Sequence, residues 1–346
     1  MAIPTTYTAA VLLCVLTMIL WGSWANMLKL GGKWRFELFC YDFAIGALLC
    51  AMIASFTVGT YGSEITFLDN LTIVRKTQIL FGFAGGAVFT IANMLLLAAI
   101  SVAGLSVAFP IGIGLGLVIG VVWNYAIKPQ GNPLYLFSGA AVVMTAIVVT
   151  ALAHRIATPK VKRPTKVSSA PLPPPAPSAL KGILLSVFAG ILMGSFYPLV
   201  ELGKEGDIEM GPYPIGFVFA CAIFGMTFLF NLYFLNLPVQ GKPLSILDYF
   251  SGTTKQHLLG WGGGAMWYGG TISNFVAASA PAEANVGPAV SFALGQGAAL
   301  VSTLWGLLVW KEFAKAPGKA KKLIWLAVLL FVGGLALISI APLFKK

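Results

Sequence analysis

The chain has 346 residues, of which 58% are hydrophobic and 10% are charged. Soluble proteins carry roughly 25% charged residues, so this chain has too little polar surface for a globule in water, which excludes a cytosolic enzyme, a secreted disulfide scaffold and a disordered protein. The formal charge of +11 falls in short basic segments between apolar runs, which favours anionic lipid headgroups on the cytoplasmic side as a partner and argues against nucleic acid.

Ten apolar segments are long enough to cross the hydrocarbon core, which takes about 20 residues of helix. Backbone groups in lipid must bond within their own segment, so each span is predicted to be a helix. The predicted spans are, in chain order, 6–28, 36–60, 77–101, 104–126, 134–153, 179–202, 212–236, 258–280, 285–309 and 322–343. The chain is therefore predicted to be an all-α, multi-pass membrane protein.

Residues 155–178 are rich in Pro, Ser and Lys and predict an extended linker between two halves. The first five-helix repeat is expected at 1–154 and the second at 179–346. Shared residues support a duplication: at an offset of 172, Trp21-Gly22-Ser23-Trp24 falls on Met193-Gly194-Ser195-Phe196 and Tyr41 falls on Tyr213, and at an offset of 178, Gly86 falls on Gly264 and Pro110 on Pro288. Since five is odd, the two repeats are predicted to be inverted.

The basic residues predict an orientation, because Lys and Arg near span ends are retained in the cytoplasm. With the N-terminus outside, 16 of the 22 basic residues lie in cytoplasmic connections. We therefore expect a plasma (inner) membrane protein with both termini outside and the linker in the cytoplasm.

Inverted repeats are a recurring plan of secondary transporters, with the solute site near the midplane between them. The alternatives are a symmetry that is only ancestral and a structural or receptor protein. An intramembrane enzyme is not expected, because the predicted spans contain no His-Glu pair, Ser/Lys dyad or metal cluster. Pro110 and Pro288 each remove a backbone donor early in a span, so we expect helix breaks there, either at the cavity or as packing kinks.

The chain resembles the ureide permease type of carrier, in the drug/metabolite transporter superfamily with bacterial glucose/ribose porters and rhamnose–proton symporters. The motifs that carry this resemblance are Trp21-Gly22-Ser23-Trp24, Tyr41-Asp42, Ala84-Gly85-Gly86 with Asn93, Gly104-Leu105-Ser106-Val107, Asn124-Tyr125, Ser302-Thr303-Leu304-Trp305-Gly306-Leu307 and Lys311-Glu312-Phe313. One departure is the short linker, which lacks the phosphate-loop-like motif of the plant proteins and so argues against nucleotide control.

The resemblance implies the drug/metabolite transporter fold, with ten transmembrane helices as two inverted five-helix repeats. It also implies import of a small polar uncharged solute by proton-coupled symport and alternating access, with the proton gradient as energy source and no cofactor. In the plant carriers the solute is a ureide such as allantoin or a nucleobase such as uracil, whereas the bacterial relatives carry out sugar transport of monosaccharides. An exporter of amino acids or drugs with the same fold is the alternative, and it predicts a more apolar cavity.

Asp42 lies about two turns inside the cytoplasmic end of the second span. An ionisable residue within a span costs about 2.5–3.5 kcal/mol on insertion scales and is therefore a functional candidate. We expect Asp42 to load and release the coupling proton. The alternative is a structural carboxylate paired with Lys29, Lys33 or Arg35.

Glu201, near the outer end of the sixth span, is the second candidate for proton coupling, and its alternative is an ion pair with Lys204. His154 and His257 lie at cytoplasmic span ends and are interpreted as interfacial residues rather than proton relays.

A neutral polar solute needs amides or hydroxyls near the midplane and flat aromatic side chains over its ring faces. The expected solute-binding residues are Asn93, Asn274, Gln296, Ser23, Asn26, Ser195, Tyr197, Trp21, Trp24, Trp267 and Tyr268. The alternatives are interfacial aromatic belts and amides that only bridge helices.

Overall fold

The computed structural model describes residues 1–62, 65–103, 105–157, 179–238 and 242–344, and all regular structure in these ranges is helical. The first half contains α1 (Tyr7–Ser23), α2 (Ala25–Leu30), α3 (Phe36–Phe56), α4 (Phe67–Ile73), α5 (Lys76–Ala103), α6 (Leu105–Ile127) and α7 (Pro133–Ala157). The second half contains α8 (Ala179–Lys204), α9 (Pro212–Asn236), η1 (Ile246–Ser251), α10 (Thr254–Ala278), α11 (Pro288–Gly295), α12 (Ala298–Leu304), η2 (Trp305–Val309), α13 (Gly318–Ile340) and η3 (Ala341–Leu343).

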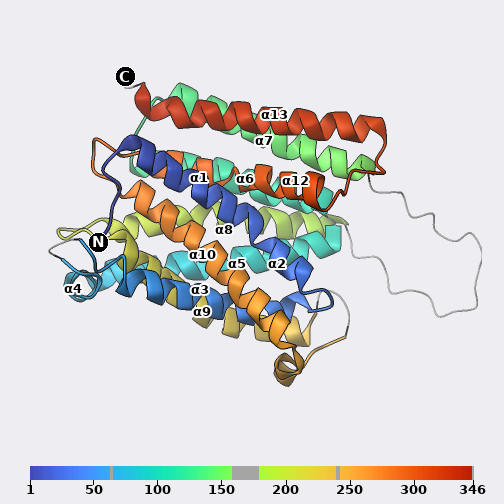
Figure 1. The fold of residues 1–346 in the computed structure, drawn as a ribbon, viewed down its shortest axis with the longest axis horizontal. Coiled ribbons are helices and arrows are strands. Elements are labelled where there is room, and N and C mark those ends of the chain that lie inside the picture. The colour runs from blue at the N-terminus through green and yellow to red at the C-terminus, as the bar shows by residue number, and fades with distance from the viewer. Residues whose placement is uncertain (63–64, 104, 158–178, 239–241, 345–346) are drawn as a thin grey trace, which may run out of the picture.

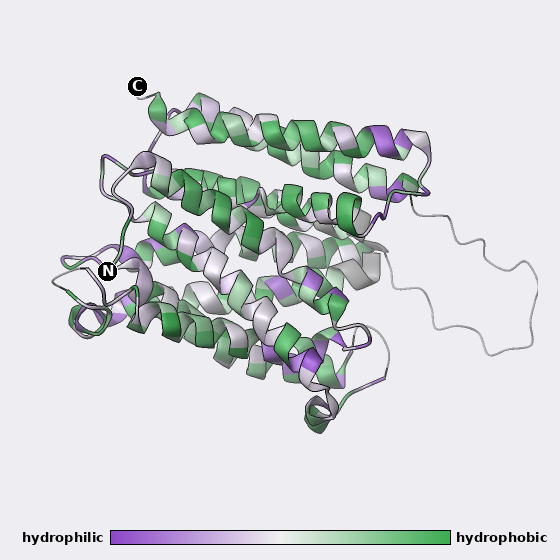
Figure 2. Cartoon of the chain, viewed as in Figure 1, coloured by the Kyte–Doolittle hydropathy of each residue, from purple (hydrophilic) through white to green (hydrophobic). Residues whose placement is uncertain are grey.

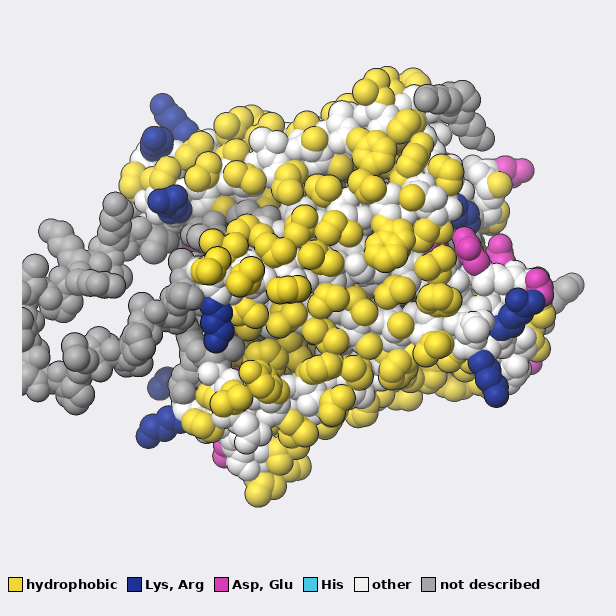
Figure 3. Space-filling view, turned by 180° about the vertical axis from the view of Figure 1, so that it is seen from behind, with side chains coloured by type: hydrophobic (Ala, Val, Ile, Leu, Met, Phe, Trp, Pro, Cys, Tyr) yellow, Lys and Arg dark blue, Asp and Glu magenta, His cyan; other side chains and the backbone are white. Residues whose placement is uncertain are grey.

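The long helices lie side by side and run along one common direction, with both chain ends at the same end of the bundle (Figure 1). Hydrophilic residues concentrate toward the ends of the helices (Figure 2). On the face seen in Figure 3, hydrophobic side chains cover the middle, and Lys and Arg lie at the two ends. A broad apolar belt between two charged rims is the surface expected of a protein embedded in lipid.

Among the described residues, eight helical segments are long and apolar enough to cross a membrane. They are Tyr7–Leu30, Phe36–Phe56, Lys76–Ala99, Pro133–Ala157, Leu180–Lys204, Pro212–Asn236, Pro288–Val309 and Gly318–Leu343. Two of the ten predicted spans are absent from this set. One corresponds to α6, which contributes the shorter apolar segment Ile111–Ile127, and the other to α10, in which glycines and polar residues lower the hydropathy. The protein is therefore a multi-pass, all-helical membrane protein.

All ten predicted ranges coincide with helical segments, but two of these segments are interrupted. Trp24 separates α1 from α2, and Gln296 and Gly297 separate α11 from α12. The prediction of a helix break at Pro288 was wrong: Pro288 is the first residue of α11, a position where its missing N–H leaves no helical bond unmade. Pro110 falls within α6, and its side chain lies outside the described residues, as does most of the predicted linker.

Glycines allow α3 and α10 to cross with their backbones nearly in contact. A Cβ at Gly264 would lie 1.9 Å from the carbonyl oxygen of Phe43, and one at Gly46 would lie 2.0 Å from that of Trp261. Helices in lipid associate through such close approach, because burying apolar side chains gives little advantage over contact with lipid tails. This crossing fixes α3 of the first half against α10 of the second.

We expect Gly264→Ala to lower the free energy of unfolding by about 1–3 kcal/mol, because the new methyl group must push two backbones apart. Gly262→Ala on the same helix is the matched control, since nothing lies within 4 Å of its Cβ position. Thermal unfolding of the purified variants in detergent measures both. Equal unfolding temperatures for the two variants would contradict a tight crossing.

Candidate functional site

A cavity of about 200 Å³ lies in the bundle, between helices of both halves. Its lining residues are Trp21, Gly22, Trp24, Ala25, Phe89, Asn93, Leu96, Ile113, Met193, Phe196, Trp267, Gln296, Ala298, Ala299 and Ser302. Five of the predicted solute-binding residues are thus brought together: Trp21, Trp24, Asn93, Trp267 and Gln296. We call this cavity the central chamber.

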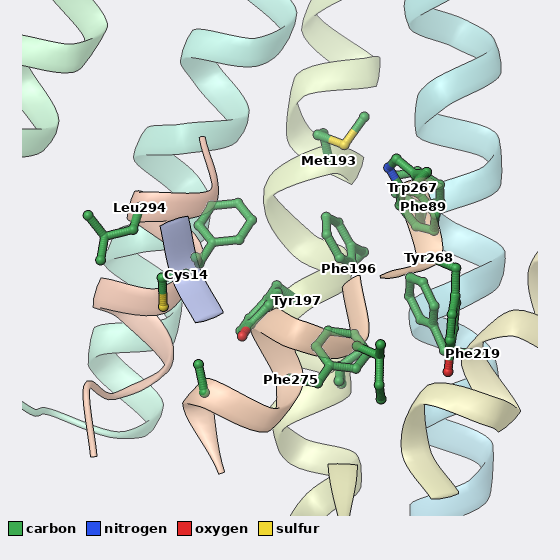
Figure 4. Close-up of a cluster of buried hydrophobic side chains, with 14 of the residues drawn as sticks. Cys14, Phe89, Met193, Phe196, Tyr197, Phe219, Trp267, Tyr268, Phe275 and Leu294 are labelled. Carbon is green, nitrogen blue, oxygen red and sulfur yellow. The ribbon is translucent and has the colours of Figure 1, made fainter. Parts of the chain in front are cut away.

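Flat aromatic side chains form one wall of the central chamber. Phe89 stacks on Trp267 with ring centroids 4.5 Å apart, and Trp21 stacks on the same indole at 6.2 Å. Figure 4 shows Phe89 and Trp267 overlapping, with Phe196 and Met193 nearby. The Trp21 indole N–H donates to the Trp267 carbonyl and to the Thr271 hydroxyl, each at 3.1 Å, so the wall is held in place before any solute arrives.

Free polar groups face the central chamber. The amide side chains of Asn93 and Gln296 and the Ser302 hydroxyl line it, and they make no hydrogen bond within the described part of the chain. Polar groups removed from water are normally hydrogen-bonded, so these three are available to a solute or to water. The two helix interruptions also reach the chamber, because Trp24 and Gln296 stand at them.

Asn274 does not belong to the chamber, although its position in mid-helix predicted it. It is fully buried, accepts a bond from the Tyr197 hydroxyl at 2.6 Å, and exchanges bonds with Ser291. The Tyr197 hydroxyl is hydrogen-bonded within the same network, and its ring lies among the buried rings of Figure 4. These side chains join α8, α10 and α11 and are structural.

Two further predicted residues also lie outside the chamber. Tyr268 is fully buried and faces Gly216 of α9, and Ser195 donates to the carbonyl of Ile191 within its own helix. Neither lines either of the cavities described here. Whether a side chain reaches the chamber depends on the rotation of its helix about the helix axis, and the position of the residue along the predicted span does not reveal that rotation.

A second cavity of about 250 Å³ adjoins the central chamber, on the side where α2 ends and α13 begins. Asn26 lines it, whereas Ser23 is buried beside it and accepts a bond from the Trp305 indole at 2.8 Å. The cavity also contains His154, which was interpreted as an interfacial residue. We call this cavity the vestibule.

Asp42 is completely buried and lines neither cavity. Its carboxylate accepts bonds from the Trp34 indole at 3.1 Å and the Tyr249 hydroxyl at 2.6 Å, and it contacts His257 Nδ1 at 2.8 Å. Burial and the neighbouring carboxylate raise the pKa of Tyr249, which therefore remains a donor. The alternative pairing with Lys29 or Arg35 was wrong, because Lys29 binds Glu312 and Arg35 binds Glu37.

His257 and Tyr249 are partly exposed partners that connect Asp42 with the surroundings. The side chain of His257 is 20% exposed, whereas that of Asp42 is not exposed at all. Its interpretation as an interfacial residue missed this contact, which joins positions 215 residues apart in the sequence.

Glu201 is buried and forms an ion pair with Lys204, 2.5 Å away and one turn further along α8. Lys204 also donates to the Ser279 hydroxyl at 3.2 Å. The structural alternative for Glu201 therefore agrees with the geometry.

Sequence reasoning missed Phe89, Phe196, Met193 and Ser302 as chamber residues. A signal for Phe89 was present, because it falls on Trp267 at the same offset of 178 that relates Gly86 to Gly264. Ser302 stands in one of the motifs that resemble the ureide permease type.

We expect Asn274→Ala to lower the free energy of unfolding by about 1–3 kcal/mol, because it leaves Tyr197 and Ser291 with unmatched polar groups. Asn93→Ala should change it by no more than about 0.5 kcal/mol, since Asn93 makes no internal bond that is lost. Thermal unfolding in detergent compares the two, and a larger loss for Asn93→Ala would contradict its assignment as a free chamber residue.

Comparisons with known proteins agree with this architecture. The Ureide permease family model matches residues 39–171. Ureide permease 2 of Arabidopsis thaliana is 24% identical over 402 residues, which cover 98% of this chain and 97% of that protein. Ureide permease 1 of the same plant is 24% identical over 395 residues, covering 97% of this chain and 98% of the relative. Transmembrane protein 144 homolog B of Dictyostelium discoideum is 28% identical over 185 residues, or 52% of this chain and 46% of that protein.

A solved structure, described as "Crystal structure of protein", shares the fold with a TM-score of 0.61 and 18% identity, covering 96% of this chain and 98% of the solved one. Permeases are transporters and not enzymes, in agreement with the prediction that the chain is not an enzyme. The chain is therefore similar to the ureide permeases over nearly its full length, and the Ureide permease family model matches part of it.

Proposed function

We propose that the chain is a secondary active transporter that imports a small, flat, uncharged ureide or related cyclic amide across the plasma membrane. The observation that carries this proposal is the central chamber between the two halves, which is lined by stacked aromatic rings and by two amides that make no side-chain bond within the described residues. The proposed mechanism is alternating access between two inverted repeats of five spans each, coupled to protons, with both termini outside.

Matching aromatic contacts support an inverted repeat. Phe89 and Trp267, which are equivalent at the offset of 178, stack directly on each other. Phe89 also contacts Phe219 at 5.9 Å, and Trp267 contacts Phe43 at 5.7 Å. A two-fold axis through the Phe89–Trp267 stack exchanges these two contacts.

Two glycine contacts are related to each other by the same two-fold exchange of the halves. A Cβ at Gly86 would meet the Phe219 carbonyl oxygen at 2.4 Å, just as one at Gly264 meets that of Phe43. These contacts equate Phe43 with Phe219, an offset of 176 in place of the 172 that puts Tyr41 on Tyr213. By this register Val218 occupies the place of Asp42, so the acid is present in only one repeat.

The pairing of the helices supports two related halves, as alternating access requires. α3 packs on α10 as α5 packs on α9, α1 packs on α10 as α5 packs on α8, and α7 packs on α13. Equivalent packings give two arrangements of similar free energy, each open to one side of the membrane. In this reading α6 and α10 complete a set of ten spans.

The chamber favours a flat amide solute over the alternatives. The wall formed by the Phe89–Trp267 stack can cover one face of a planar ring, and the amides of Asn93 and Gln296 can donate to and accept from a solute amide. The Arabidopsis relatives are named ureide permeases. A monosaccharide is the second candidate, because it needs amides as well. An exporter of drugs or amino acids is less consistent with two free amides.

Counterflow in proteoliposomes with radiolabelled allantoin, uracil and glucose tests the proposal. We expect allantoin or uracil counterflow in the unmodified protein and a loss of about tenfold in Gln296→Leu, since a lost hydrogen bond of about 1.4 kcal/mol is a factor of ten. Ser195→Ala is the matched control, because Ser195 bonds only within its own helix. Glucose counterflow alone would transfer the assignment to sugars, and no flux of any of the three would refute it.

We propose that Asp42 holds the coupling proton, with His257 as its contact with the cytoplasmic side. Phe43, the next residue of α3, contacts both Trp24 and Trp267 in the chamber wall. A change of charge at Asp42 therefore acts on the crossing of α3 and α10 that holds the wall. Glu201, which remains the second candidate, is neutralised by Lys204 and has no comparable link to the chamber.

Asp42→Asn should abolish pH-driven accumulation and leave solute exchange measurable, because the amide keeps the shape but takes up no proton. Tyr249→Phe is the control, since it removes one donor and keeps the carboxylate. Uptake and counterflow are measured in proteoliposomes with and without a pH gradient. Accumulation that persists in Asp42→Asn would exclude this residue from coupling.

A further inference from the structure

The vestibule is lined by polar side chains that can form hydrogen bonds with a solute. Asn26, Thr150, Ser302 and Thr303 line it. The hydroxyls of Thr150 and Thr303 donate to carbonyls in their own helices and keep lone pairs that can accept. Asn26 uses one of its amide hydrogens on the Ser23 carbonyl, which leaves the other available.

Two indoles form preorganised walls of the vestibule. The Trp310 N–H donates to the Asn26 side chain at 2.6 Å, and the Trp305 N–H donates to Ser23 at 2.8 Å. Bonded in this way, the rings need little ordering when a solute arrives, and preorganisation favours binding.

The charges at the mouth of the vestibule cancel. Lys29 binds Glu312 at 2.8 Å and lies over the Trp310 ring, 4.2 Å from its centroid. Both side chains of this ion pair are about two-fifths exposed, at 45% and 40%, so the vestibule opens to the surroundings there. An entrance whose two charged side chains are paired with each other is suited to a neutral solute. His154, packed on Phe313 with ring centroids 4.9 Å apart, is the other titratable group in the lining.

The vestibule and the central chamber share four lining residues: Gly22, Ala25, Ala299 and Ser302. Three of them have small apolar side chains or none, and the fourth carries the unbonded hydroxyl. A solute leaving the chamber on this side therefore passes one free polar group and enters the vestibule. The larger volume, about 250 Å³ against about 200 Å³, leaves room for a second solute molecule.

We propose that the vestibule is a second binding site for the transported class of solute, a neutral ring compound with amide groups, separate from the site in the central chamber. This inference rests on the proposed function. Its residues are Asn26, Thr150, Ser302, Thr303 and Trp310, and sequence reasoning had named only Asn26 among them.

Equilibrium dialysis of radiolabelled allantoin against the purified protein in lipid nanodiscs tests the inference. We expect two molecules per chain for the unmodified protein and one for Thr150→Phe, whose ring fills the vestibule and does not reach the chamber lining. Thr145→Phe is the matched control on the same helix, because Thr145 is exposed on the outside of α7, and it should keep both sites. Gln296→Leu should weaken the chamber site about tenfold and leave the vestibule site unchanged.

Each outcome separates the two proposals. A single site in the unmodified protein that survives in Thr150→Phe would overturn the vestibule site and leave the proposed function intact. No binding of allantoin, with uracil and glucose also negative, would refute the proposed function and the second site with it.

A cysteine variant keeps the test independent of how Thr150→Phe folds. None of the native cysteines lines either cavity, so Thr150→Cys adds a thiol in the vestibule. Allantoin should slow its reaction with a methanethiosulfonate reagent several-fold, even when Gln296→Leu weakens the chamber site. Unchanged labelling in that double variant would overturn the inference.

Discussion

The structure depends on close contact between the backbones where α3 crosses α10 and where α5 crosses α9. Lipid gives helices little hydrophobic reason to associate, so close packing of small residues must hold the halves together. Gly46, Gly86 and Gly264 make these crossings possible, each with a Cβ position within 2.4 Å of a facing carbonyl oxygen. Because the backbones approach so closely, Phe43 packs on Trp267 and Phe219 packs on Phe89, and these contacts support the Phe89–Trp267 stack in the chamber wall.

The length and place of the helices could be predicted from the sequence, because hydrocarbon thickness and backbone bonding leave few choices. The two helix interruptions could not be predicted from the sequence. Trp24 stands between α1 and α2 with no Pro nearby, and Pro288 suggested a break where α11 simply begins. The true interruption at Gln296 depends on packing around Gly297, where a Cβ would meet Met18 at 2.5 Å.

The candidate site could be predicted only in part, because a span does not reveal which side of a helix faces a cavity. Asn93 and Asn274 occupy similar depths in their helices. Asn93 lines the chamber and makes no side-chain bond within the described residues, whereas Asn274 is bonded to Tyr197 and Ser291. The environment of Asp42 was equally hidden, since Tyr249 and His257 lie 207 and 215 residues further along the chain. The offset of 178 pairs Phe89 with Trp267, so it held a signal for this stack that the sequence analysis did not use.

The solute and proton gradients, and not the free energies of the two packings, would set the direction of net transport, so a departure from symmetry matters for how a proton is coupled to the solute. In the repeat register proposed above, Val218 occupies the place of Asp42, whose bonds to Tyr249 and His257 link the two halves of the chain. A ligand shifts a two-state equilibrium by its difference in affinity for the two states. A proton that binds Asp42 in one packing better than in the other would therefore bias that packing, whereas Glu201 pairs with Lys204 on the adjacent turn of its own helix.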